Sequence, residues 1–243
     1  MFRKIINMIP IEKRWDIERK ILTFFDLYGR KFYSFEGEDA ILFALFNHLK
    51  KVDKGFYVDV GANHPKRFSN TYYFYKKGWS GINIDANPGS IEIFNKYRKR
   101  DINLEFPISD EDYELDFYVF NESCISSFDK ELSEERTRLN PNYKIMDVLK
   151  VKTKKLKDVF DKYLPKNQSI DFMSVDTEGH DLHVLKSNDW SKYRPNILLV
   201  EENNKNLETI FSGELYKFVK EQGYNLFAKT FNTLVFVDKS VKE

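Results

Sequence analysis

Two acidic residues stand where a pocket for a small molecule would need them. Asp59 lies near the end of the apolar run 56–60 and is followed closely by Gly61, while Asp85 ends a second apolar run, 81–85. A glycine lets the backbone turn sharply and lie against a ligand. An acid at the end of the second strand of such a unit accepts hydrogen bonds from ribose hydroxyls. The spacing therefore predicts a nucleoside-binding turn.

The glycine-rich fingerprint of pyrophosphate sites, G-x-G-x-x-G, is missing from this turn. Gly61 stands alone, and Ala62, Asn63 and His64 occupy the positions where further glycines would stand. This absence disfavours NAD and similar cofactors. It favours a nucleoside without phosphate, of which S-adenosylmethionine (SAM) is the common example. The alternative is an ordinary strand-turn-helix without a ligand.

A third group of polar residues follows two later apolar runs. Asp176, Glu178 and His180 come after one run, and Glu201 comes after the other. Methyl transfer to an oxygen needs an aligned acceptor and a base, and His180 titrates near neutrality. Asp176 and Glu178 are the rival bases, alone or with a divalent metal that these four side chains would ligate. The other interpretation of Asp176 to Gly179 is a helix N-cap.

Strands and helices alternate along the chain between these sites. Residues 121–147 are polar and are expected to be irregular. The core strands are expected at 56–60, 81–85, 102–108, 170–175, 197–200, 224–229 and 233–237, with additional strands at 115–120 and 148–156. The helices are expected at 39–49, 68–77, 89–99, 156–163, 182–188 and 206–221. The alternation predicts a Rossmann-like α/β fold with a mostly parallel seven-stranded sheet and helices on both faces.

Four stretches of the sequence resemble the FkbM-type methyltransferases. Val58-Asp59-Val60-Gly61-Ala62-Asn63 is similar to the family's first SAM motif, and residues 34–39, 81–88 and 171–185 match further stretches in the same order. The resemblance covers residues 33–238. It implies a class I SAM-dependent methyltransferase.

The resemblance also implies roles for individual residues. Asp85 is expected to hold the ribose hydroxyls, and Asp59 to order the turn or reach the methionine amine. Glu38 is expected to approach SAM, and Ser109 to lie beside the adenine. The candidate cofactor residues are Glu38, Asp59, Gly61, Asn63, Asp85, Ala86, Ser109 and Asp176. The candidate catalytic residues are His180, Asp176, Glu178 and Glu201.

The acceptor is expected from the family resemblance alone. The resemblance implies O-methylation of a sugar or nucleotide-sugar precursor of a surface glycan. Two alternatives remain open: methylation of another small hydroxylated metabolite, such as a polyketide-like one, and a non-catalytic module that binds SAM or a nucleotide.

Composition favours a cytoplasmic protein. The 39 basic and 38 acidic residues give a net charge of +1, so no overall field attracts nucleic acid. The single cysteine, Cys124, excludes an intramolecular disulfide and fits a reducing compartment. No apolar run approaches the ~18 residues of a membrane span, and residues 1–10 lack the pattern of a signal peptide. Stable membrane insertion is therefore not expected.

The chain is expected to have two parts. Residues 1–33 mix basic and aromatic side chains and are expected to form an N-terminal arm with an amphipathic helix over 11–27. Residues 34–243 are expected to form the methyltransferase domain.

Overall fold

The computed structural model describes residues 11–26, 28–49, 54–110, 114–203 and 206–241. The chain divides into two compact units, residues 1–32 and 33–243. Within the first unit, helix α2 (Ile11–Phe24) lies inside the expected helix over 11–27, and the first ten residues of the expected arm lie outside the described residues. Over the described ranges, no helix combines the length and apolar character that crossing a membrane requires.

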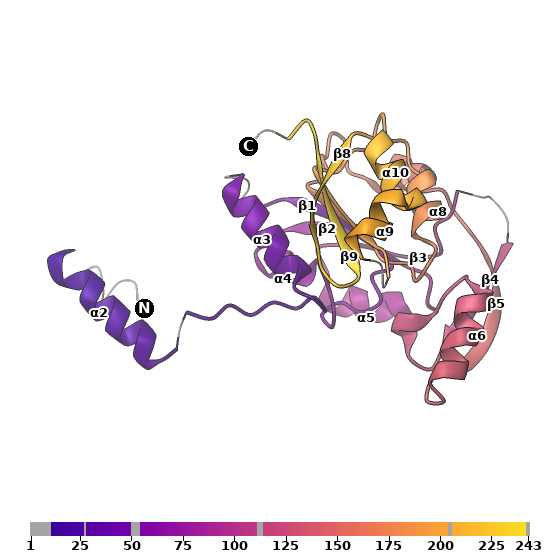
Figure 1. Ribbon diagram of the computed structural model, residues 1–243, viewed down its shortest axis with the longest axis horizontal. Helices are drawn as coiled ribbons and strands as arrows, with labels where there is room; N and C mark the ends of the chain where they lie inside the picture. Colours follow the sequence, from indigo (N-terminus) through magenta and orange to yellow (C-terminus); the bar gives the residue numbers. More distant parts are fainter. Residues whose placement is uncertain (1–10, 27, 50–53, 111–113, 204–205, 242–243) are drawn as a thin grey trace. The chain divides into compact units, whose positions relative to one another are not determined.

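The second unit is built on a seven-stranded sheet with the order β3-β2-β1-β6-β7-β9-β8 (Figure 1). Strand β9 runs antiparallel to β7 and β8, and the other neighbours pair in parallel. The expected mostly parallel Rossmann-like sheet is therefore confirmed. The strands are β1 (Phe56–Val60), β2 (Ser80–Asp85), β3 (Ile102–Glu105), β6 (Phe172–Val175), β7 (Ile197–Glu201), β8 (Tyr224–Lys229) and β9 (Thr233–Asp238).

Strand β1 is the centre of this sheet. All five of its residues are buried, and it pairs with β2 on one side and β6 on the other. Asp59 stands in register with Asn83 of β2 and Ser174 of β6. Because the chain order reverses at β1, a crevice opens there at the carboxyl ends of the strands.

Helices cover both faces of the sheet. In Figure 1, α3 and α4 lie on one side, and α8, α9 and α10 lie on the other. The expected helix over 206–221 is two helices, because Gly213 between them is extended (φ −65°, ψ 150°). The helices are α3 (Glu38–His48), α4 (Tyr72–Lys76), α5 (Ser90–Tyr97), α7 (Leu156–Tyr163), α8 (Asp181–Lys186), α9 (Leu207–Ser212) and α10 (Glu214–Glu221).

An aromatic cluster fixes α3 and α4 to the sheet. Phe46 of α3, Phe74 of α4, Trp79 and Phe172 of β6 pack with ring centroids 4.9–6.1 Å apart. Buried aromatic side chains contribute much of the hydrophobic stabilisation of a core. The cluster therefore anchors the two helices that flank the crevice.

Residues 114–152, here called the insertion, form a second, two-stranded sheet. Strands β4 (Glu114–Phe120) and β5 (Ile145–Lys152) pair antiparallel (Figure 1). In the sequence, η1 (Ser123–Ile125) and α6 (Lys130–Leu139) come between the two strands. The prediction of irregular structure over 121–147 was wrong. Asp129 caps α6 by accepting a 2.8 Å hydrogen bond from the Leu132 amide, and helix-favouring residues follow it.

Candidate active site

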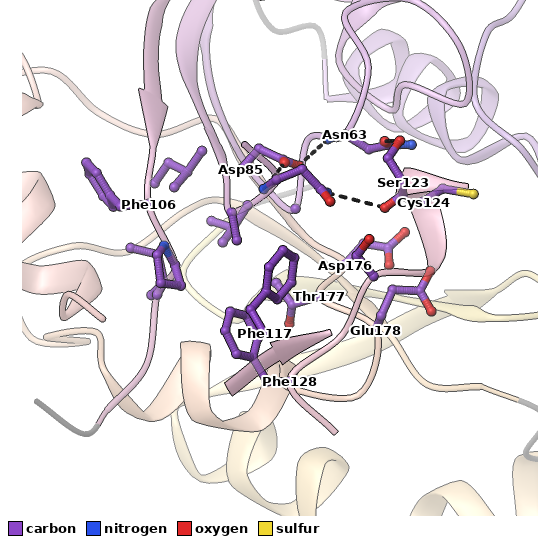
Figure 2. Close-up of a pocket in the computed structure, with 18 residues that line it drawn as sticks. Asn63, Asp85, Phe106, Phe117, Ser123, Cys124, Phe128, Asp176, Thr177 and Glu178 are labelled. Carbon is purple, nitrogen blue, oxygen red and sulfur yellow. Dashed lines mark hydrogen bonds between the residues drawn. The ribbon is translucent and has the colours of Figure 1, made fainter. Parts of the chain in front are cut away.

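Two adjoining cavities open at the carboxyl ends of the parallel strands. A wide cleft of about 500 Å³ lies by β1, β6 and β7, and a narrow cavity lies by β1 and β2 (Figure 2). Five residues line both cavities and so mark their junction: Gly61, Asn63, Cys124, Asp176 and Glu178.

Gly61 is required where the ends of β1 and β6 meet. Its φ is +82°, and a Cβ at this position would lie 1.7 Å from the Asp176 carbonyl oxygen. The Asp176 amide also donates to the Val60 carbonyl at 2.9 Å. Glycine alone fits so close an approach with a positive φ, and the contact holds Asp176 at the junction.

Asp85 orders the loops beside the narrow cavity. Its carboxylate accepts hydrogen bonds from the Asn63 and Asn87 amides, each at 2.7 Å, and burial raises its pKa. Ala86 lines the same cavity. Among the described residues, the Asn87 Oδ1 and Thr177 Oγ1 atoms are buried without a hydrogen-bond partner. Both residues line the narrow cavity, so a polar ligand there would find unused hydrogen-bonding groups.

The remaining wall of the narrow cavity is apolar. Phe106, Ile108, Phe117 and Phe128 line it, and Figure 2 shows the rings of Phe117 and Phe128 close to Thr177. Aromatic and aliphatic walls suit a flat ring system. Ser109 follows Ile108 but is itself buried, and its hydroxyl lies 3.0 Å from the His180 Nε2 atom. It is not among the described residues that line either cavity.

Three carboxylates gather in the wide cleft. Oxygen atoms of Asp176, Glu178 and Glu201 lie within 4.8 Å of one another. The Asp176 side chain is exposed to solvent in the cleft, although the surrounding protein still removes part of the water from its carboxylate. Burial and the charges of Glu201 and Glu178 raise its pKa well above the usual value, and burial with the Glu178 charge raises the pKa of Glu201 to about 8. Such a group can accept a proton or bind a cation.

The insertion reaches this cluster through Glu178. Arg136 of α6 forms an ion pair with the Glu178 carboxylate, and Ser127 Oγ donates to the Glu178 carbonyl at 2.7 Å. Glu178 has a φ of +55°, a strained value for a residue with a side chain. The two contacts hold the strained turn in place. Nothing in the sequence distinguishes Arg136 from the neighbouring Arg138, which is exposed.

His180 is not brought together with the carboxylates. Its ring stacks on His183 with centroids 4.5 Å apart and is not among the described residues lining either cavity. Burial and the His183 charge lower its pKa to about 4. Asp181, next to it, accepts hydrogen bonds from the Thr177 and Gly179 amides and so supports the turn.

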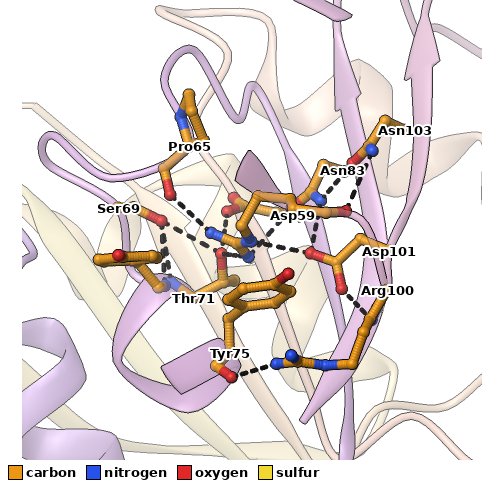
Figure 3. A network of polar contacts seen from close by, with 12 residues as sticks. Asp59, Pro65, Ser69, Thr71, Tyr75, Asn83, Arg100, Asp101 and Asn103 are labelled. Carbon is orange, nitrogen blue, oxygen red and sulfur yellow. Dashed lines mark hydrogen bonds and ion pairs between the residues drawn. The ribbon is translucent and has the colours of Figure 1, made fainter. Parts of the chain in front are cut away.

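Asp59 lines the wide cleft at the edge of a buried polar network (Figure 3). Thr71 Oγ1 donates to its carboxylate at 2.8 Å, and burial raises its pKa to about 6. The network is centred on Arg98, which is fully buried and forms a 2.8 Å ion pair with Asp101. The sequence did not indicate Arg98, because it lies in a basic stretch with Lys96, Lys99 and Arg100.

Glu38, the first residue of α3, also lines the wide cleft. It is buried, and its carboxylate accepts from the Glu36 amide and the Thr233 hydroxyl, each at 3.0 Å. It therefore joins the start of α3 to the start of β9, next to the cleft.

The sequence matches the Methyltransferase FkbM domain over residues 59–226. The chain belongs to the FkbM methyltransferase family. This agrees with the resemblance found in the sequence and makes the protein a SAM-dependent methyltransferase. None of the curated proteins matches the sequence significantly.

Two solved structures are similar to this FkbM-family chain in fold. One is a TehB-like SAM-dependent methyltransferase from Corynebacterium glutamicum ATCC 13032, with 10% identity and a TM-score of 0.44 over 93% of this chain and 97% of that one. The other is the precorrin-6y C5,15-methyltransferase of Geobacter metallireducens GS-15, with 10% identity and a TM-score of 0.41 over 83% and 88%.

Proposed function

We propose that this FkbM-family methyltransferase methylates a hydroxyl of a sugar in its wide cleft. The observation that carries the proposal is the position of Asp176. It lines both the wide cleft and the narrow cavity, and it lies next to the carboxylates of Glu178 and Glu201. A hydroxyl held there would meet a proton acceptor where the two cavities join.

The adenosine half of SAM would enter at the narrow cavity, which measures about 50 Å³, so its walls would have to move apart to admit the ligand. Asp85 would accept hydrogen bonds from the ribose hydroxyls, and the Phe106 and Ile108 side chains would pack on the adenine. Asn87 Oδ1 supplies a buried acceptor without a partner among the described residues. When bound, SAM supplies a methyl group on a sulfonium. Glu38, Asp59 and Asn63 line the wide cleft beyond Gly61 and would face its methionine half.

Asp176 is the base in this proposal, in place of His180. Its raised pKa reflects burial and the neighbouring carboxylates, which make it a better proton acceptor than an ordinary aspartate. Asp176 would take the acceptor proton while Glu201 and Glu178 keep its pKa high. The pKa of His180 is lowered to about 4, so His180 is a weak base, and it is not among the described residues that line either cavity.

The same three carboxylates favour a second mechanism. Carboxylate oxygens are the ligands that Mg²⁺, Ca²⁺ and Mn²⁺ prefer, and Asp176, Glu178 and Glu201 offer three within 4.8 Å. A divalent ion there would neutralise the cluster and lower the pKa of a bound hydroxyl. The ion-paired Arg136 would then hold Glu178 as a ligand.

Transfer of labelled methyl groups from SAM to a panel of sugars tests the proposal. Turnover should appear with one or more sugars and fall by about 10²–10⁴-fold in Asp176→Asn, while S-adenosylhomocysteine still binds in calorimetry. Chelation with EDTA separates the two mechanisms: activity that survives EDTA assigns the base role to Asp176 alone. Activity that is lost with EDTA and restored by Mg²⁺ or Mn²⁺ assigns the metal. Turnover only with non-sugar hydroxyl compounds would overturn the sugar acceptor.

We infer that this reaction takes place in the cytoplasm and that residues 34–243 carry it. Cys124 is the single cysteine of the chain, and a chain with one cysteine fits a reducing compartment. All the residues assigned to the site fall within the second compact unit. Fractionation of the producing cells, followed by assay for SAM-dependent methyl transfer, tests this location.

A further inference from the structure

Two phenylalanines are exposed on the wall of the wide cleft. Phe35 is 67% exposed and Phe68 is 41% exposed, although their rings contact each other edge to face with centroids 4.8 Å apart. Both line the cleft. Exposed aromatic pairs leave apolar surface in water unless a ligand covers it. The pair therefore presents an apolar surface within the cavity that holds the carboxylates.

The backbone at Phe68 is strained. Its φ is +56°, a region that glycine and asparagine enter readily and that a bulky residue avoids. Asn63, in the same loop, has a similar φ of +49° at much smaller cost. Two contacts fix this conformation. Phe68 forms an isolated parallel β-bridge with Ser34, and the Arg67 guanidinium lies 4.4 Å from the centre of the Phe68 ring. Strain of this kind concentrates at functional sites.

The charges of the cleft disfavour an anionic ligand. Both arginines that line it are already paired, Arg67 with Glu122 at 3.0 Å and Arg136 with Glu178. The negative charge of Glu201 already helps to raise the pKa of the neighbouring Asp176. A phosphate in this cleft would add negative charge to theirs. Hydroxyl groups, in contrast, would donate hydrogen bonds to the same oxygens.

We propose that Phe35 and Phe68 form the acceptor subsite, on which the apolar face of an uncharged sugar ring lies while its hydroxyls face the cleft carboxylates. This inference rests on the proposed sugar methylation and narrows it. A free or lipid-linked neutral glycan fits the subsite, and a sugar phosphate fits it poorly. A stacking role would explain why phenylalanine occupies this strained position. An asparagine would reduce the strain but would offer no ring on which a sugar could stack.

The test uses the full chain saturated with S-adenosylhomocysteine and a panel of methyl glycosides of glucose, galactose, mannose, rhamnose and fucose, with binding followed by saturation-transfer NMR. At least one methyl glycoside should bind, and its glycosyl 1-phosphate counterpart should bind more weakly. Phe68→Ala and Phe35→Ala should each weaken glycoside binding about three- to tenfold, with the affinity for S-adenosylhomocysteine unchanged. Phe227→Ala is the matched control, because Phe227 is 60% exposed on β8 and is not among the described cleft residues.

A second comparison tests the strained backbone. Phe68→Gly and Phe68→Ala both remove the ring, but glycine accepts the positive φ more readily. The glycine variant should therefore melt at the higher temperature, and the reverse order would contradict the strain.

The outcomes separate the two proposals. If no methyl glycoside binds the wild-type complex, the sugar acceptor itself is refuted, and the subsite with it. If glycosides bind equally well to the wild type and to the Phe35 and Phe68 variants, only the subsite is refuted. Tighter binding of the glycosyl phosphate would also overturn the uncharged acceptor.

Discussion

Arg98 and Asp59 are joined through a single hydroxyl group. Thr71 Oγ1 accepts a 2.8 Å hydrogen bond from Arg98 Nη2 and donates one of 2.8 Å to the Asp59 carboxylate. Arg98 also donates to the Pro65 carbonyl at 2.9 Å. A buried cation thus holds the loop between β1 and α4, which lines the wide cleft.

The first prediction concerns this link. Thr71→Val keeps the side-chain shape and removes the hydroxyl, which leaves one hydrogen bond of Arg98 and one of Asp59 unmade. Unfolding in urea should show a loss of about 1–3 kcal/mol of stability, and S-adenosylhomocysteine should bind more weakly because the loop is less ordered. Thr137→Val, at an exposed position of α6, is the control. Equal stability of Thr71→Val and the wild type would show that the link is not stabilising.

The second prediction concerns Asp85. Asp85→Asn keeps the size of the side chain but loses the charge and one of the two acceptor oxygens that face the Asn63 and Asn87 amides. Calorimetry should show about tenfold weaker binding of S-adenosylhomocysteine, since charge-assisted contacts contribute about 1.5–3 kcal/mol. Asp116→Asn removes a carboxylate of β4 that pairs with Lys150 and should leave the affinity unchanged. An unaltered affinity in Asp85→Asn would remove Asp85 from the cofactor site.

The third prediction separates the two candidate bases. Asp176→Asn should lower turnover by about 10²–10⁴-fold, whereas His180→Ala should change it by less than about tenfold. Turnover should fall as the pH drops through the raised pKa of Asp176, because a base must be deprotonated. In Glu201→Gln, this limb of the pH profile should move to lower pH, since one neighbouring negative charge is gone. A limb that disappears in His180→Ala would return the role to His180.

The fourth prediction concerns stability. Burial and neighbouring carboxylates raise the pKa values of Glu201 and Asp181 to about 8 in the folded chain, above the ~4 of unfolded chains. The folded state therefore holds these protons more tightly, and the stabilisation is complete below pH ~4 and is lost as the pH rises through about 8. Urea unfolding at pH 5 to 9 should show a smaller loss of stability for Glu201→Gln than for the wild type. Parallel curves would contradict the raised pKa of Glu201.

The sequence predicted the elements of the sheet more accurately than the contacts of the site. Apolar runs that end in acids located β1, β2, β6 and β7, because buried parallel strands leave a strong local pattern. The expected strand over 102–108 ends at Glu105, two residues before Pro107, which cannot donate to a ladder.

The site depended on contacts between distant parts of the chain. His180 follows Gly179 as expected, but its ring turns to Ser109 and His183, and no local pattern encodes that direction. Arg136 reaches Glu178 from 42 residues away. Phe35 precedes β1 in the sequence and Phe68 follows it, although their rings are in contact. Such pairs are set by tertiary packing, which periodicity does not report.

The insertion is hydrogen-bonded as a sheet of its own, and β4 and β5 pair only with each other within the two sheets of the described chain. Its side chains reach the cofactor side at several points: Ser123 donates to Asn63, Ser127 and Arg136 contact Glu178, and Phe117 and Phe128 line the narrow cavity. A different hairpin grafted between β3 and α7 would leave the pairing of the seven-stranded sheet unchanged, but it would have to reproduce these contacts and the apolar wall of the narrow cavity. Redesign of the insertion in the laboratory would therefore change the walls of both cavities at once, and its cofactor-side residues would have to be kept while the others are varied.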